Sequence, residues 1–545
     1  MPTVLERTQP ALAARGSSLE STALLPEAAL TSLPLNVLWV PRSCGLMTDL
    51  ELELTERYDA TDLLHMVASR QVTAQALLMA FRKRATIAQQ CTNCLTELIP
   101  QAIDDAKACD EYLARTGQPI GPLHGLPISV KEQISIAGHC TNAGFVAWAS
   151  NVSQEDAHIV KSLKKLGAVV FARTNQPQSL MHLETSNNIY GATVHPMNRN
   201  LTAGGSTGGE AALMAMKGTP LGIGGDIGGS IRAPAALNGI YGLVPTPGRI
   251  SGENVVVATP GCDSIVGTLG PMARSLRDLK LFCRAYSSSL PWIEDVSLIP
   301  SDILCPALGR QLEPALPLRV GILLDDGVVS PLPPVRRVMD KVTTRLIHSS
   351  IITVKTFIPL EHGKAWEIIT ANYFEDAGAD IRKICHEGSE PIDPLTEWIL
   401  NECEVNTAKV GSTLQERKSS RDRFRQLYAA HWRSQEIDVV LCPITPSTAP
   451  PPGTSKYWGY TAIWNLLSFP SVALPAASLV REGNTVGELL NELYVPKNDI
   501  EAHLYKHYSP ESSAGMPVGV QVVAPRLHEN VVMAAAQIIE EALRG

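Results

Sequence analysis

The chain has 545 residues, of which 45% are hydrophobic and 18% are charged, and its formal net charge is −8. This composition is typical of a globular protein that is long enough to bury a sizeable core. Lysine and arginine are spread along the chain without a dense basic run, which argues against nucleic acid as a partner.

The N-terminus and the cysteines indicate a cytoplasmic protein. The first twenty residues lack a long apolar segment and include Glu6 and Arg7, so we expect no secretory signal. The 11 cysteines form neither a disulfide framework nor a zinc pattern, and we expect no metal and no other cofactor. The uncharged stretch 457–480 contains prolines, and we interpret it as core rather than as a membrane anchor.

Predicted strands and helices alternate along the chain. Residues 1–33 lack clear periodicity and are predicted to form a flexible extension, followed by one large domain over 34–545. Residues 58–90 have a helical pattern, in which Thr73 is placed to cap a helix. Strands are predicted at 126–130, 168–172, 319–324, 439–442 and 518–523, and helices at 156–166, 208–217 and 529–543. This alternation predicts an α/β domain with one mixed central sheet, covered by helices on both faces.

The densest motif, from Gly204 to Pro234, reads GGSTGGEAALMAMKGTPLGIGGDIGGSIRAP. Thr207 and Glu210 have the spacing of a capping box, which would place the preceding serine just before a helix. Consecutive glycines ahead of Ser230 permit a tight turn that directs backbone amides toward one point, as an oxyanion hole requires. A simple glycine-rich turn remains the alternative. Neither the Walker phosphate loop nor the G-x-S-x-G elbow fits.

This segment resembles the signature of the amidase signature enzymes, including two serines 24 residues apart and the ending DIGGSIRAP. Three further segments are similar to motifs of that family, namely 121–132 (GPLHGLPISVKE), 174–180 (TNQPQSL) and 515–523 (GMPVGVQVV). The similarity covers about 35 to 545, with a catalytic core at about 120–250, and is nearest to the fungal acetamidase-like branch. It implies the family's α/β fold and hydrolysis of a carboxylic amide to the acid and ammonia or an amine.

The resemblance also implies roles for individual residues. Ser230 would attack the carbonyl and form an acyl-enzyme, Ser206 would relay the proton from a cis peptide bond, and Lys131 would be the base. The expected oxyanion and substrate contacts are Leu180, Ser206, Ile227, Gly228, Gly229 and Ser230. The expected supporting residues are Asp226, Arg232, Thr207 and Ser129. The implied partner is a small-molecule amide, and a homodimer is left open.

A lysine can act as a base only in its neutral form. Lowering its pKa from about 10.4 to about 7 requires roughly 4–5 kcal/mol of burial or like-charge effects. On a strand, Ser129 and Lys131 point to one face and Glu132 to the other, so Glu132 need not pair with the amine.

Other functions fit the same signature. The chain is also compatible with a glutaminase subunit of a tRNA-dependent transamidation complex, with an amide- or ester-trimming enzyme of a biosynthetic pathway, and with a non-catalytic binding relative. Gly225 replaces a usual threonine and Thr207 a usual serine, which leaves substrate preference open. Candidates for an apolar funnel are Tyr373, Phe374, Trp458, Trp464 and Phe469.

Overall fold

One mixed sheet of 11 strands organises the chain, in the order β1-β3-β2-β6-β8-β7-β12-β13-β11-β9-β10. The computed structural model describes residues 3–300, 302–303, 316–480 and 494–544. The strands of this sheet are β1 (Leu95–Leu98), β2 (Pro127–Lys131), β3 (Val169–Thr174), β6 (Leu221–Asp226), β7 (Tyr241–Val244), β8 (Thr268–Ala273), β9 (Leu318–Ile322), β10 (Ile352–Thr356), β11 (Val439–Pro443), β12 (Ser471–Leu474) and β13 (Val520–Val523). Strands β4 (Val194–His195) and β5 (Asn198–Thr202) form a separate pair.

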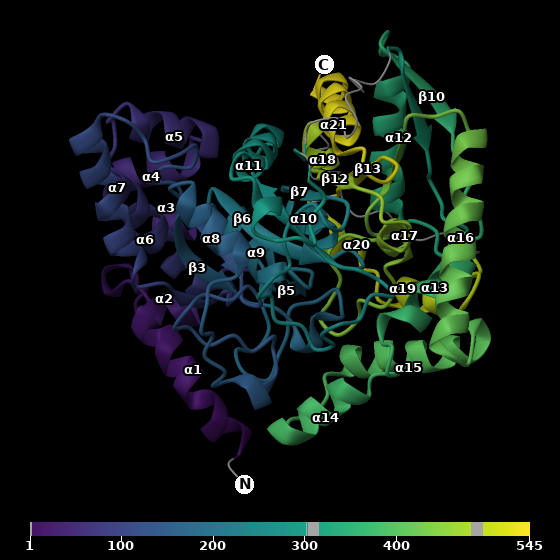
Figure 1. Cartoon of the computed structure of the whole chain (residues 1–545), viewed down its shortest axis with the longest axis horizontal. Coiled ribbons are helices and arrows are strands. Elements are labelled where there is room, and N and C mark those ends of the chain that lie inside the picture. The colour runs from purple at the N-terminus through teal and green to yellow at the C-terminus, as the bar shows by residue number, and fades with distance from the viewer. Residues whose placement is uncertain (1–2, 301, 304–315, 481–493, 545) are drawn as a thin grey trace.

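Helices flank this sheet (Figure 1). They are α1 (Val4–Ser18), α2 (Glu27–Thr31), α3 (Val40–Ser43), α4 (Asp49–Glu56), α5 (Ala60–Ala68), α6 (Ala74–Thr92), α7 (Ala102–Thr116), α8 (His158–Lys165), α9 (Gly208–Ala215), α10 (Arg232–Asn238), α11 (Leu276–Ser288), α12 (Pro333–Ile347), α13 (His362–Tyr373), α14 (Ala379–Gly388), α15 (Pro394–Val410), α16 (Leu414–Ser434), α17 (Gly459–Leu467), α18 (Ala476–Leu479), α19 (Asp499–Lys506), α20 (Pro510–Ser513) and α21 (Glu529–Arg544). The predicted α/β domain with a mixed central sheet and flanking helices is confirmed.

The first half of the sheet contains β2, which ends at Lys131, and β6, which leads to Ser230. Strand β2 pairs in parallel with β3 on one side and with β6 on the other. Every residue of β2, β3 and β6 is buried. Parallel strands covered on both faces tolerate continuous apolar runs, which explains why 126–130 and 168–172 could be recognised as strands. The end of β2 and the end of β6 therefore lie side by side.

Most predicted elements have counterparts in the structure. The five predicted strands correspond to β2, β3, β9, β11 and β13, and the three predicted helices to α8, α9 and α21. The pattern over 58–90 is split into α5 and α6, because Thr73 caps a new helix by accepting a hydrogen bond from the Ala76 amide.

The uncharged stretch 457–480 contains α17 and β12, both fully buried, and the core interpretation is confirmed. Of the helices in the described ranges, none combines the length and hydropathy needed to cross a bilayer.

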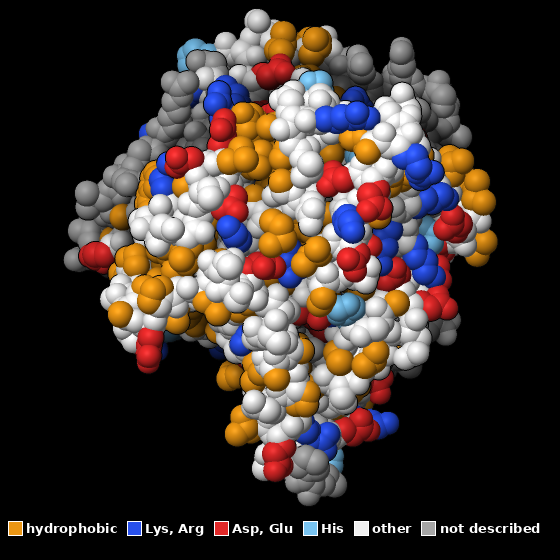
Figure 2. Space-filling view, turned by 90° about the vertical axis from the view of Figure 1, so that its left-hand side faces the viewer, with side chains coloured by type: hydrophobic (Ala, Val, Ile, Leu, Met, Phe, Trp, Pro, Cys, Tyr) orange, Lys and Arg blue, Asp and Glu red, His pale blue; other side chains and the backbone are white. Residues whose placement is uncertain are grey.

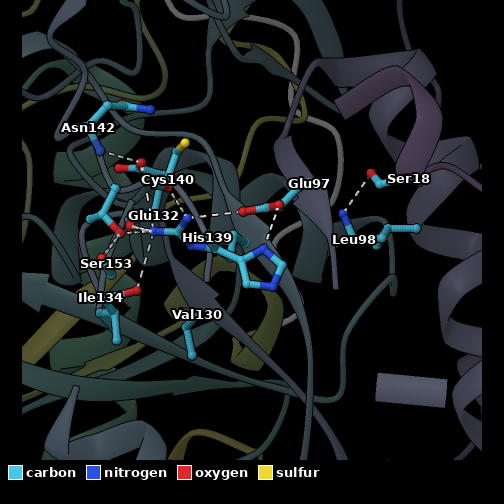
Figure 3. Close-up of polar contacts among 12 residues, drawn as sticks. Ser18, Glu97, Leu98, Val130, Glu132, Ile134, His139, Cys140, Asn142 and Ser153 are labelled. Carbon is cyan, nitrogen blue, oxygen red and sulfur yellow. Dashed lines mark hydrogen bonds and ion pairs between the residues drawn. The ribbon is translucent and has the colours of Figure 1, made fainter. Parts of the chain in front are cut away.

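The N-terminal region differs from the expected flexible extension. It contains α1, the short 3-10 helix η1 (Ser21–Ala23) and α2. The Leu98 amide of β1 donates a hydrogen bond to Ser18 Oγ at 3.0 Å (Figure 3), and Arg82 of α6 pairs with Glu20 at 2.5 Å. These long-range contacts hold the region against the sheet and α6. They have no local sequence pattern, which is why periodicity alone did not reveal an ordered segment.

The surface formed by the N-terminal helices carries charges of both signs. Figure 2 shows lysine and arginine interspersed with aspartate and glutamate, together with scattered apolar side chains. Charged residues of the N-terminal helices also form ion pairs, for example Asp59 at the start of α5 with Arg277 of α11 at 2.5 Å. Over the described residues of this face, neither sign forms a continuous field.

Candidate active site

Lys131 is the last residue of β2 and is 1% exposed. Its Nζ donates a hydrogen bond to Ser206 Oγ at 2.5 Å. Burial lowers the pKa of Lys131 to about 7, against the opposing influence of the negative charges of Asp226 and Glu132. The amine is therefore partly neutral near pH 7.

The Glu132 carboxylate belongs to a polar network of its own. It accepts a hydrogen bond from the backbone amide of Asn142 at 2.7 Å (Figure 3). It accepts a second one from the amide of Ala143 at 3.1 Å. The Arg173 guanidinium lies 3.7 Å from the same carboxylate and pairs with Glu97 at 3.0 Å. These partners occupy Glu132, and the expectation that it does not pair with the amine of the catalytic candidate is confirmed.

Ser206 follows β5 and precedes α9, and the Gly205–Ser206 peptide bond is cis. Only glycine fits at position 205, because a Cβ there would lie 2.3 Å from the carbonyl oxygen of Glu184. The next amide, that of Thr207, donates to the carbonyl of Ser230 at 3.1 Å. This hydrogen bond joins the two serine-bearing segments directly.

The predicted capping box at the start of α9 is wrong. Thr207 occupies the N-cap position, but its hydroxyl donates to the carbonyl of Gly225 at 3.2 Å. The Glu210 carboxylate is fully buried and accepts hydrogen bonds from Ser129 Oγ and, at 3.0 Å, from Thr174 Oγ1. Burial raises the pKa of Glu210 to about 7. Glu210 thus connects α9 to β2 and β3 instead of closing the helix end.

Asp226 ends β6 and organises the turn that leads to Ser230. Its Oδ1 accepts from the Gly229 amide, from Arg232 Nη2 and from Asn465 Nδ2, each at 2.9 Å. Its Oδ2 accepts from the Ile231 amide at 3.0 Å and from Arg232 Nε at 3.1 Å. Burial by itself would raise the pKa of Asp226, but the charge of Arg232 and these hydrogen bonds hold it below its usual value.

Three of the four amides expected at the oxyanion remain available. The Gly229 amide is directed to Asp226, so it is not a free donor in this arrangement. Within the described ranges, no residue accepts a hydrogen bond from the amides of Ile227, Gly228 or Ser230. A Cβ at position 228 would lie 2.5 Å from Tyr373 Oη, so the turn requires glycine at this point of close approach.

A cavity of about 350 Å³ brings the separated motifs together. Lys131, Ser206 and Ser230 all line it, as does Leu180, whose backbone φ is +66°. Among the funnel candidates, Tyr373 and Phe374 line this cavity, and Trp458 lines a small recess next to Gly228 and Ser230. Trp464 and Phe469 instead pack in the core. Lining residues without any sequence motif include Gln133, Val257, Ile265, Val266 and Ile381.

Known proteins are similar to this chain in sequence and in fold. The amidase family model matches residues 76–533. A Schizosaccharomyces pombe protein with an amidase name is 43% identical over 502 residues, which are 92% of this chain and 92% of that protein. An acetamidase of Emericella nidulans is 34% identical over 523 residues, 93% of each. A solved structure of a fatty acid amide hydrolase is similar with a TM-score of 0.91 and 32% identity, over 99% of this chain and 95% of that one. Because the likeness includes the two serine segments, the lysine strand and the whole sheet, this chain belongs to the amidase signature family and is a hydrolase that acts on amide bonds.

Proposed function

We propose that the chain hydrolyses a neutral carboxylic amide to the acid and ammonia through a Ser230 acyl-enzyme, with Ser206 and Lys131 transferring the proton. One observation carries this proposal: the buried amine of Lys131 lies 2.5 Å from Ser206 Oγ in the cavity that Ser230 also lines. A serine hydroxyl becomes a strong nucleophile only when a neighbouring base takes its proton.

In the acylation step, neutral Lys131 accepts the Ser206 proton while Ser206 accepts the proton of Ser230. The Ser230 oxygen attacks the amide carbon and forms a tetrahedral intermediate. The available amides of Ile227, Gly228 and Ser230 support the negative charge that develops on the oxyanion. The protonated lysine then returns the proton through Ser206 to the leaving nitrogen, and ammonia departs as the C–N bond breaks.

In the deacylation step, the same groups work in reverse order. A water molecule takes the place of the departed ammonia, and its proton passes through Ser206 to Lys131. The resulting hydroxide attacks the ester carbon, and the proton returns to Ser230 as the C–O bond breaks. Asp226 and Arg232 hold the turn in place throughout, and neither of them touches the reacting atoms.

The cavity lining favours neutral substrates. Among the described lining residues, the charged side chains are Lys131 and Asp226, and both are engaged by protein groups. A charged acyl group would lose hydration without gaining a counter-ion. Glutamine carries two charges near its α-carbon, so the glutaminase alternative is less well supported than hydrolysis of aliphatic or aryl amides. The biosynthetic alternative uses the same chemistry and differs only in substrate.

The test is labelling with a fluorophosphonate probe, combined with a screen of amides from acetamide to aryl amides and glutamine. We expect Ser230 to be labelled, and Ser230→Ala to lose labelling and turnover while its far-UV circular dichroism and melting temperature are retained. Labelling of another serine in folded Ser230→Ala would refute the assignment of Ser230 as the nucleophile. A kcat/KM for glutamine above that for neutral amides would favour the glutaminase alternative.

A further inference from the structure

The substrate cavity contains a polar side chain that the proposed chemistry does not use. Gln133 lies in the turn after β2 and is 7% exposed. Its backbone is fixed on both sides: its amide donates to Gln176 Oε1 at 3.1 Å, and its carbonyl accepts from the Val256 amide at 2.9 Å. Its carboxamide lines the cavity and makes no hydrogen bond with any residue in the described part of the chain.

Gly225 lies against that carboxamide. A Cβ built on Gly225 would lie 3.6 Å from Gln133 Nε2, 3.8 Å from Gln133 Oε1 and 3.6 Å from Leu269 Cδ2. These are ordinary van der Waals distances, so the glycine leaves a small recess that a methyl group would fill without displacing a neighbour. The recess therefore has a polar wall made by Gln133 and an apolar wall made by Leu269.

The polar carboxamide of Gln133 lies among mostly apolar side chains. Much of the remaining lining is apolar, including Leu180, Val257, Ile265, Phe374 and Ile381. A carboxamide offers two donors and an acceptor that carries two lone pairs. Covering these groups with a hydrocarbon chain costs free energy, because their hydrogen bonds to water are lost without replacement.

We propose that Gln133 and Gly225 form a specificity subsite for an acyl group that carries a neutral hydrogen-bonding substituent, namely a hydroxyl, a carbonyl or a second amide. The inference rests on the proposed function. Ammonia is about the size of a water molecule, so most of the cavity of about 350 Å³ is left for the acyl group. Gln133 acts here by contacting the substrate away from the bond that is cleaved.

The experiment compares kcat/KM within matched pairs of amides. Each pair consists of the amide of a five- or six-carbon acid and an analogue with one hydroxyl or keto group, placed in turn along the chain. The enzymes are the wild type, Gln133→Met, Gly225→Ala and Gly252→Ala. Methionine keeps the length of glutamine and removes its hydrogen bonding. Gly252 lines the same cavity, and a Cβ there meets nothing within 4 Å, so it is the matched control.

We expect the wild type to prefer at least one oxygenated analogue over its hydrocarbon partner by roughly three- to tenfold, the range of one neutral hydrogen bond. Gln133→Met should abolish or reverse that preference by improving the hydrocarbon amide, a gain that a merely structural role would not produce. Gly225→Ala should reduce the preference, whereas Gly252→Ala should keep the wild-type ratio of kcat/KM within each pair. All three variants should keep the wild-type melting temperature.

Two results would overturn the subsite: a wild type without preference in any pair, or a Gln133→Met variant that loses activity equally on both members of every pair. Failure of the proposed function has a different signature, because the wild type would then hydrolyse no amide in the panel and no probe would label Ser230.

Discussion

At the scale of single residues, the site depends on a lysine that is kept from water. Lys131 is 1% exposed and its ammonium would face no carboxylate within hydrogen-bond distance in the described residues, since Glu132 and Asp226 are held by other partners. Burial therefore dominates, and it lowers the pKa of Lys131 to about 7.

This pKa predicts the pH dependence of the reaction. Only neutral Lys131 accepts a proton, so kcat/KM should rise about tenfold per pH unit below pH 7 and level off above it. Lys131→Ala should lower kcat/KM by several orders of magnitude. Lys131→Arg should be equally inactive, because arginine stays protonated and cannot accept the proton. A pH series of initial rates tests this. Near-normal turnover in Lys131→Arg would show that the side chain supplies only positive charge.

The same burial predicts a stability change. The folded pKa lies near 7 and the unfolded value at 10.5, so between these values the unfolded chain binds more protons and stability rises with pH. Lys131→Met removes the free-energy cost of burying a protonated amine. We expect it to stabilise the protein by on the order of 3–5 kcal/mol below pH 7, at about 1.4 kcal/mol per pKa unit, and by progressively less toward pH 10. Urea unfolding at several pH values measures this. A gain that does not depend on pH would contradict the explanation.

At the scale of elements, the ends of β2 and β6 and the start of α9 are locked together by buried polar contacts. Gly222 of β6 lies directly against Glu210, and a Cβ there would come within 1.9 Å of Glu210 Oε1. Glu210 cannot yield easily, because hydrogen bonds from Ser129 and Thr174 fix its carboxylate.

Two glycines of β6 should therefore respond differently to the same substitution. Gly222→Ala should destabilise the protein by roughly 2–4 kcal/mol through overpacking and lost hydrogen bonds. It should also lower kcat, because a displaced Glu210 would shift the start of α9 and with it Ser206. Gly225→Ala, whose Cβ would meet its nearest atoms at 3.6 Å, should fold with unchanged stability. Thermal and urea unfolding provide the comparison. Equal stability of the two variants would show that α9 is not held through Glu210.

The turn before the nucleophile should depend on the ion pair between Asp226 and Arg232. Removing the carboxylate in Asp226→Ala leaves a guanidinium that is 1% exposed without its charge partner, which typically costs about 3–5 kcal/mol. We expect lower stability and loss of activity, measured by urea unfolding and by probe labelling of Ser230. Full stability in the alanine variant would contradict this account.

At the scale of the whole molecule, the N-terminal helices are part of the packed structure. Arg82 is 3% exposed, and Glu20 at 2.5 Å is its carboxylate partner. Deleting residues 1–33 should lower the melting temperature, because it leaves Arg82 without this charge. Glu20→Gln should reproduce part of the loss, about 1–3 kcal/mol for a hydrogen bond to a charged group. A truncated chain that melts at the wild-type temperature would support the flexible extension that the sequence suggests.

The local sequence determined a large part of this fold. Continuous apolar runs identified β2, β3, β9, β11 and β13, because a buried strand needs no polar alternation. Helical spacing and the cap at Thr73 identified α6 to within a few residues. The motif around Ser230 indicated the tight turn and its glycines, since these depend on the backbone freedom of consecutive residues.

The tertiary structure decided everything that depends on residues far apart in the chain. It supplies the Asn142 and Ala143 amides that bind Glu132, and it directs the Gly229 amide to Asp226. It also binds Glu210 to β2 and β3 where the local spacing suggested a helix cap. It also joins Gln133 and Gly225 in one cavity. Capping and strand formation involve residues within a few positions of each other, so a sequence reveals them. A buried carboxylate takes whichever donors the packing brings near it, and spacing along the chain does not specify those donors.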